Sequence, residues 1–165
     1  MNNKQEEHTM ETTYNIHPTE ARWTHVALRV KDINATIEWY TENTPLSLVT
    51  RREDETGYAA WLGHTDNPHS PFLLVLSQFF PDKDPFADAP NTVLGPFAHL
   101  GIELPDLESL KEAAEKMQAA GSLVMPIQEM PPPIGWIFMA KDPDGNTLEF
   151  SFDQGVYATF QELAE

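Results

Sequence analysis

The sequence predicts an α+β fold built from two similar halves, each with one helix and four strands in the order β-α-β-β-β. The first observation is an internal repeat, because an offset of 74 residues carries His25 onto His99 and Asp32 onto Asp106. The second is the alternation of apolar and polar side chains at the start of each half, which is typical of a half-buried strand. A repeat of this kind indicates two copies of one structural unit.

The first half begins with an alternating strand at residues 23–30. Asp32 follows it as the expected N-cap of a helix, which the Asn-Thr-Pro sequence at 43–45 ends. Further strands are expected at residues 47–52, 57–62 and 71–78. The segment 79–96 is rich in proline and aspartate but contains aromatic residues, so it is expected to be a linker that packs over the first half.

The second half repeats the pattern from a strand at residues 97–104. Asp106 is the expected N-cap of a helix over residues 107–120, and Gly121 follows as its C′ residue. The remaining strands are expected at residues 123–125, 135–140 and 147–152. The prolines of residues 131–133 are expected to form a hinge after the first of them.

This pattern divides the chain into one folded domain at residues 22–155 and two ends. Within the domain, the first module spans residues 22–78 and the second spans 97–153. Residues 1–21 are polar, acidic and aperiodic, and they predict a disordered or loosely docked arm. Residues 156–165 are expected to form a short tail or helical turn.

Charge and composition exclude several classes of function. The formal net charge is −16 and no basic cluster offsets it, so binding to nucleic acid or to a membrane surface is not expected. The absence of cysteine excludes a disulfide scaffold, an iron–sulfur cluster and a cysteine nucleophile. No secretory signal and no apolar stretch of about 20 residues is found, so a cytoplasmic protein is expected.

The two faces of each predicted sheet differ in chemistry. One face carries aliphatic side chains such as Leu28 and Leu100, and it is expected to lie under the helix. The other face carries small, polar and ionisable side chains, among them His25, His99 and Glu149. Two such faces brought together would form a concave, partly polar cup.

His25, His99 and Glu149 are the candidate ligands of a metal ion in this cup. A buried, unpaired carboxylate costs several kcal/mol, and a divalent cation offsets that cost while two neutral imidazoles donate to it. Two histidines and one carboxylate leave open positions for substrate, water or dioxygen. Each residue taken alone is more often an ordinary surface side chain, so it is the coincidence of all three on matching faces that favours a metal site.

Four segments resemble the vicinal oxygen chelate superfamily, which includes glyoxalase I, bleomycin-resistance proteins, fosfomycin-resistance transferases and type I extradiol dioxygenases. The segment 136–150 resembles the family's closing strand–turn–strand, which ends in a metal-binding glutamate. The segments 24–28 and 98–102 resemble its two opening strands, and 37–43 resembles the end of its first helix. The resemblance spans residues 23–153 and implies two tandem βαβββ modules that form a curved mixed sheet.

The resemblance also implies a ligand set and a dimer. The family's metal-binding histidines fall on His25 and His99 and its glutamate on Glu149, whereas the fourth ligand position falls on Val75, which cannot bind a metal. Glyoxalase I has an acidic or amide ligand at that position. A ligand set of two histidines and one glutamate with an apolar fourth position resembles instead that of the extradiol dioxygenases and the fosfomycin transferases. The metal is expected to be Fe(II), with Mn, Ni or Zn as alternatives, and the chain is expected to form a homodimer.

The expected function is that of an Fe(II) extradiol-type dioxygenase acting on a small aromatic or vicinal-oxygen substrate. The alternatives are a glyoxalase I-like lyase or isomerase, and a non-catalytic, bleomycin-resistance-like protein that binds a small molecule. A fosfomycin-type transferase ranks lower. Arg29 is the one basic residue on the inferred polar faces of the three strands that carry the candidate ligands, and it is expected to pair with Glu103.

Two further sets of residues are candidates for the cup. The acid/base candidates, which could equally be surface residues, are His64, His69 and Tyr58. The aromatic candidates for its wall, which could equally be core residues, are Trp23, Trp61, Phe97 and Trp136.

Overall fold

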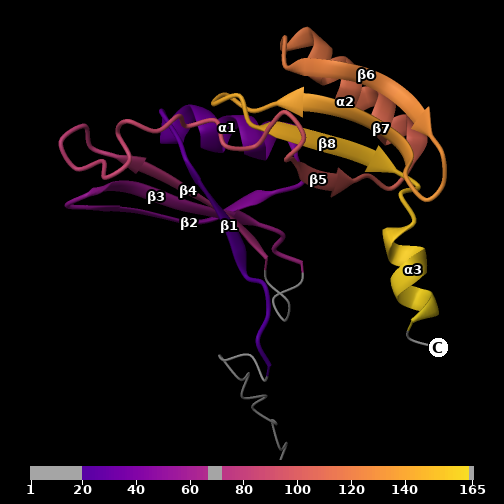
Figure 1. Ribbon diagram of the computed structural model, residues 1–165, viewed down its shortest axis with the longest axis horizontal. Coiled ribbons are helices and arrows are strands. Elements are labelled where there is room, and N and C mark those ends of the chain that lie inside the picture. The colour runs from indigo at the N-terminus through magenta and orange to yellow at the C-terminus, as the bar shows by residue number, and fades with distance from the viewer. Residues whose placement is uncertain (1–19, 67–71, 164–165) are drawn as a thin grey trace, which may run out of the picture.

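The computed structural model of the chain describes residues 20–66 and 72–163, and it confirms two βαβββ units (Figure 1). The first unit contains β1 His25–Arg29, α1 Ile33–Asn43, β2 Ser47–Asp54, β3 Gly57–Gly63 and β4 Leu73–Phe79. The second unit contains β5 Leu100–Glu103, α2 Leu107–Ala119, β6 Leu123–Met130, β7 Gly135–Lys141 and β8 Thr147–Phe152. The predicted arm, apart from residues 20 and 21, lies outside the described residues, and so does His69.

A third helix, α3 Val156–Glu162, occupies part of the predicted tail. It has no buried residue and extends away from both sheets (Figure 1). None of the helices in the described part of the chain has the length and apolar character needed to cross a lipid bilayer.

Each unit forms a four-stranded sheet with the same strand order, β1-β4-β3-β2 in the first and β5-β8-β7-β6 in the second. The first strand of each unit runs parallel to the last, and the other pairs are antiparallel. Ala27 pairs with Val75 in one sheet as Gly101 pairs with Glu149 in the other. The offset of 74 residues is therefore a property of the strand register as well as of the sequence.

The two predicted helix N-caps are confirmed. Asp32 Oδ1 accepts hydrogen bonds from the backbone N–H of Asn34 at 2.9 Å and of Ala35 at 3.1 Å. Asp106 Oδ1 accepts one from Ser109 at 2.7 Å, and this bond holds the pKa of the Asp106 carboxyl below its ordinary value. Both carboxylates satisfy amide groups that the first helical turn leaves without partners.

Strand β6 is longer than the sequence predicted. The expected end was Met125, directly before Pro126, but the strand continues to Met130. β6 is an edge strand with two register shifts, the second of them between Met125 and Gln128. A proline is tolerated at such a place because an edge strand leaves part of its N–H groups without a ladder partner.

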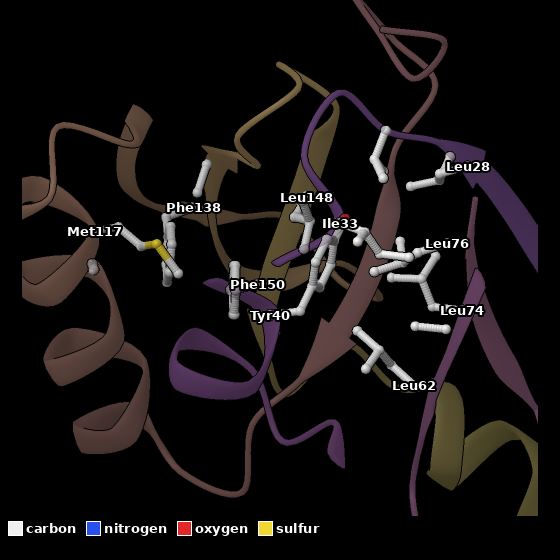
Figure 2. Close-up of a cluster of buried hydrophobic side chains, with 14 of the residues drawn as sticks. Leu28, Ile33, Tyr40, Leu62, Leu74, Leu76, Met117, Phe138, Leu148 and Phe150 are labelled. Carbon is white, nitrogen blue, oxygen red and sulfur yellow. The ribbon is translucent and has the colours of Figure 1, made fainter. Parts of the chain in front are cut away.

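One hydrophobic core joins the two units through α1. Ile33 and Tyr40 of this helix lie between Leu74 and Leu76 of the first sheet and Phe150 of the second (Figure 2). All five side chains are at most 6% exposed. Burying an aliphatic or aromatic side chain of this size stabilises the folded state by about 1.5–3 kcal/mol. The aliphatic sheet faces are therefore buried, as predicted.

The turn between β7 and β8 is fastened to the first unit by buried polar contacts. Tyr40 Oη donates a hydrogen bond to Asp142 Oδ2 at 3.0 Å, and the backbone N–H of Lys31 donates to Asp144 Oδ1 at 3.1 Å. Asp142 Oδ1 also accepts from the backbone N–H of Asn146 at 2.8 Å, which closes the turn. These contacts fix where β8 begins relative to α1.

The first part of the linker packs on the first unit, where Arg29 holds it, and the backbone N–H groups of Val93 and Leu94 in its last part donate to Asn146 of the second unit. The Arg29 guanidinium donates to Asp84 Oδ2 at 2.7 Å and to the backbone carbonyls of Phe86 and Ala89. The predicted pairing of Arg29 with Glu103 is wrong, because the linker brings its own carboxylate to Arg29. The Arg29 side chain is only 13% exposed, so these contacts occupy it.

Replacing Tyr40 by phenylalanine tests the contact between the β7–β8 turn and α1. We expect Tyr40→Phe to lower the free energy of unfolding by about 1–3 kcal/mol, because it removes one hydrogen bond and leaves a buried carboxylate oxygen less satisfied. Urea denaturation measures this change. Tyr157→Phe on the exposed face of α3 is the matched control, and an equal effect of both substitutions would contradict the role of the Tyr40–Asp142 contact.

The same residue predicts a dependence of stability on alkaline pH. Burial, followed by the charge of Asp142, raises the pKa of Tyr40 above its ordinary value. Above about pH 10 the tyrosine ionises in the unfolded chain but stays neutral in the folded one, so the stability falls as the pH rises. We expect the free energy of unfolding of the parent protein to decline more steeply above pH 10 than that of Tyr40→Phe. Parallel declines of the two proteins would contradict a raised pKa of Tyr40 in the folded state.

Candidate functional site

Strands β5 and β8 bring His99 and Glu149 together. The parallel register pairs Gly101 with Glu149, and His99 lies two residues before Gly101 on the same face of the sheet. His99 Nε2 is 3.7 Å from Glu149 Oε2. Glu149 is 6% exposed, and a Cβ built on Gly101 would meet no atom within 4 Å, so the space beside the carboxylate is open.

In its neutral form, the His99 ring presents a lone pair to this carboxylate. Its Nδ1 lies 2.6 Å from the backbone carbonyl oxygen of Phe97. A carbonyl oxygen only accepts hydrogen bonds, so in the neutral ring Nδ1 carries the proton and Nε2 carries the lone pair. Nε2 and the Glu149 oxygen are then two acceptors facing each other, at a separation too long for a hydrogen bond.

This donor set fits a divalent metal ion. A neutral imidazole nitrogen and a carboxylate oxygen are ligands that Zn, Fe, Mn and Ni accept. A cation between the two groups would remove the repulsion of the facing lone pairs and would neutralise the buried carboxylate. In the part of the chain that the structure describes, the one cationic group within salt-bridge distance of Glu149 is the His99 ring, if it is protonated.

The two residues lie on the wall of a cavity of about 790 Å³ over the open face of the second sheet. Most of its lining is apolar and comes from the strands of this sheet and from the linker. The apolar residues include Phe97, Met125, Met130, Ile134, Ile137 and Met139. The polar side chains of the lining, besides His99 and Glu149, include Lys141, Thr147 and Gln154, and Gln154 bonds to Glu149. A ligand with an apolar body and a polar end matches this distribution.

His25 lies apart from this pair. It is exposed on β1, and its Nδ1 is 2.9 Å from Thr24 Oγ1. Within residues 20–66 and 72–163 no three His, Asp or Glu side chains form a group that could hold a metal. A single chain therefore brings two of the three predicted ligands together, and the complete set stays a prediction.

Val75 occupies the place in the first sheet that Glu149 occupies in the second. It pairs with Ala27 on one side and with Trp61 on the other, on the face that carries His25. Of the three predicted ligands, the open face of the first unit thus carries one and the open face of the second carries two.

Tyr58 and His64, the two acid/base candidates that the structure describes, do not line the cavity. Tyr58 packs edge-on against Phe80, with ring centroids 5.4 Å apart, and His64 is an exposed residue beyond β3. Among the aromatic candidates only Phe97 lines the cavity. Trp23 is 87% exposed on the other unit. Trp136 packs against the hydrophobic core, because it lies on the opposite face of β7 from Ile137.

Gln154 is a site residue that the sequence pattern did not reveal. Its Nε2 donates a hydrogen bond to Glu149 Oε1 at 2.7 Å. The residue lies beyond the end of β8, where neither strand alternation nor a helical period predicts the direction of a side chain. The one signal in the sequence is the glycine that follows it, which indicates a turn.

Comparison with known proteins identifies the family. A model of the Glyoxalase/Bleomycin resistance protein/Dioxygenase superfamily matches residues 22–150, and the chain belongs to this superfamily. The chain is also 28% identical over 131 residues to the uncharacterized protein PA2024 of Pseudomonas aeruginosa, a match that covers 79% of this chain and 88% of that protein.

Solved structures share the fold. Glyoxalase I of Leishmania major superposes with a TM-score of 0.60 at 19% identity, covering 87% of this chain and 94% of that one. The fosfomycin resistance protein FosX of Listeria monocytogenes superposes with a TM-score of 0.60 at 14% identity, covering 81% and 93%. The predicted family and its fold of two βαβββ modules are therefore confirmed.

Proposed function

We propose that the chain is a metal-dependent enzyme that acts on a small molecule with an apolar body and two adjacent oxygen atoms. The observation that carries this proposal is the pair of facing donors, His99 Nε2 and Glu149 Oε2, on the wall of a largely apolar cavity. Within this class, an Fe(II) extradiol-type dioxygenase acting on a small aromatic substrate is the reaction that we favour.

The third ligand in this proposal is His25 of a second copy of the chain. His25 is the repeat equivalent of His99, it is exposed, and it lies on an open sheet face. Trp23 and Phe97, which are equivalent residues beside the two histidines, are each 87% exposed. A homodimer that places the β1 face of one chain over the cavity of the other would cover both aromatic side chains and bring the three ligands together.

The residues of the chain have separate tasks in this site. When bound, the metal supplies a Lewis acid and, if it is iron, a path for electrons between substrate and dioxygen. The bond from His99 Nδ1 to the Phe97 carbonyl fixes the ring so that Nε2 points at the site. The methionine and isoleucine side chains of the cavity contact the apolar body of the substrate and exclude water from its reacting end.

The alternatives are less well supported. A phosphonate substrate needs several cationic groups, but Arg29 is occupied by the linker and Lys141 is the one basic residue of the cavity. A glyoxalase I-like reaction is disfavoured by Val75, which has no donor atom. A non-catalytic binding protein would use the apolar cavity alone and would not need the His99–Glu149 pair. The expected cytoplasmic location stays a prediction.

Metal binding tests the proposal directly. We expect protein purified without chelator to hold about one divalent ion per chain, and Glu149→Gln to weaken that binding at least about tenfold while the chain stays folded. Elemental analysis and a chelator competition measure both. Glu129→Gln, on the exposed edge of β6, is the matched control. A parent protein without metal that still binds aromatic ligands would favour the non-catalytic alternative.

Turnover tests the reaction itself. We expect the iron-loaded protein to consume dioxygen with at least one member of a panel of catechols and to produce the yellow ring-opened product. The Glu149→Gln variant should be inactive with the same compound. Stoichiometric iron without oxygen uptake on the whole panel would leave the metal site in place but remove the dioxygenase assignment.

Mixing two defective variants tests whether each site uses two chains. His25→Ala and Glu149→Gln should each lack the complete ligand set. In a mixture refolded together, random pairing gives mixed dimers with one intact site, so we expect about a quarter of the parent metal capacity to return. If all three ligands came from one chain, mixing would restore nothing, and that result would exclude the shared site.

A further inference from the structure

The chain beyond β8 turns back onto the buried carboxylate of Glu149. Asp153 and Gly155 both have left-handed backbone conformations, with φ values of 60° and 76°. These two residues flank Gln154, and the turn that they form brings its side chain to Glu149, five residues earlier in the sequence. Gln154 also lines the cavity described above.

Gln154 is held by three hydrogen bonds. Its backbone N–H donates to Glu103 Oε1 at 3.0 Å, and its side-chain oxygen accepts from Ser151 Oγ at 3.2 Å. Its side-chain Nε2 donates to Glu149 Oε1 at 2.7 Å. Since a carboxylate only accepts hydrogen bonds, the amide must present its NH₂ group to Glu149. The orientation of the amide is thus determined at both of its ends.

The turn that carries Gln154 has little room to move. A Cβ on Gly135 would lie 2.3 Å from the Asp153 carbonyl oxygen, and a Cβ on Gly155 would lie 3.3 Å from Pro133. The backbone of residues 153–155 therefore packs directly against the connection between β6 and β7. A contact made from a confined turn holds its direction better than one made from a free tail.

The two oxygens of Glu149 consequently differ. Oε1 accepts the short hydrogen bond from Gln154, and Oε2 faces His99 Nε2 at 3.7 Å. A carboxylate can bind a metal through one oxygen or through both, and binding through both uses two coordination positions. A hydrogen bond that occupies one oxygen favours binding through the other alone.

We propose that Gln154 is a positioning residue that directs Glu149 to the metal through Oε2 only, so that one more coordination position stays free for substrate. This inference rests on the metal site of the proposed function. Gln154 acts through Glu149, and its loss allows the carboxylate to rotate and to bind through both oxygens or to leave the site.

The test compares Gln154→Met, which keeps the length of the side chain and removes the donor, with Gln118→Met on the exposed surface of α2 as the matched control. With Co²⁺ as the probe, we expect Gln154→Met to weaken binding about 10–100-fold and to change the intensity of the visible absorption bands, which report the coordination number. Ser151→Ala, which frees the amide without removing it, should produce a smaller shift in the same direction. Equal affinity and identical spectra for Gln154→Met and the parent would overturn the inference.

A second measurement needs no metal. In the metal-free protein, a double-mutant cycle of Gln154→Met and Glu149→Met should show non-additive shifts of the denaturation midpoint, because the two residues share one hydrogen bond and each substitution removes one of its partners. Additive shifts would overturn the positioning contact. A parent protein that binds no Co²⁺ would overturn the proposed function and the coordination part of this inference, while the cycle would still decide whether Gln154 holds Glu149.

Discussion

The parallel pairing of β5 with β8 is the constraint on which the rest of the site depends. It sets Gly101 opposite Glu149 and so puts His99 on the same face as the carboxylate. Side chains alternate along a strand, so a slip of one residue would turn Glu149 into the core and expose Leu148 and Phe150. Those two side chains are at most 1% exposed, and their burial therefore fixes the register that the polar face uses.

Both ends of β8 are anchored, and each anchor belongs to a different part of the molecule. At the start of the strand, Asp142 and Asp144 of the preceding turn bind to Tyr40 and to the backbone of Lys31 in the first unit. At its end, the confined turn of residues 153–155 folds back beside β7. Glu149 lies between the two anchors, so the contacts that hold the units together also hold the carboxylate in place.

The two units have the same strand order, but their open faces carry different candidate metal ligands. The first keeps a histidine at residue 25 and has Val75 where the second has Glu149, and its open face is exposed. The second keeps both His99 and the carboxylate beside an apolar cavity. Arg29 is used to hold the linker, and Lys141 is left as the lysine of the cavity lining, so the cavity keeps little positive charge of its own. This division favours a metal and a largely apolar substrate over an anionic one.

The sequence by itself determined the two units, the aspartate caps of α1 and α2, the buried and open faces of each sheet, and the placement of His99 and Glu149 on one face. These features follow from side-chain alternation, helix capping and sequence repetition, which can be read from residues close together in the sequence. Only the tertiary structure decided that His25 lies apart from the other two ligands, that Arg29 binds Asp84, and that Gln154 reaches Glu149. These contacts depend on how the two units pack around α1 and on where the linker and the last turn lie. The periodicity of helices and strands does not predict the course of such irregular segments.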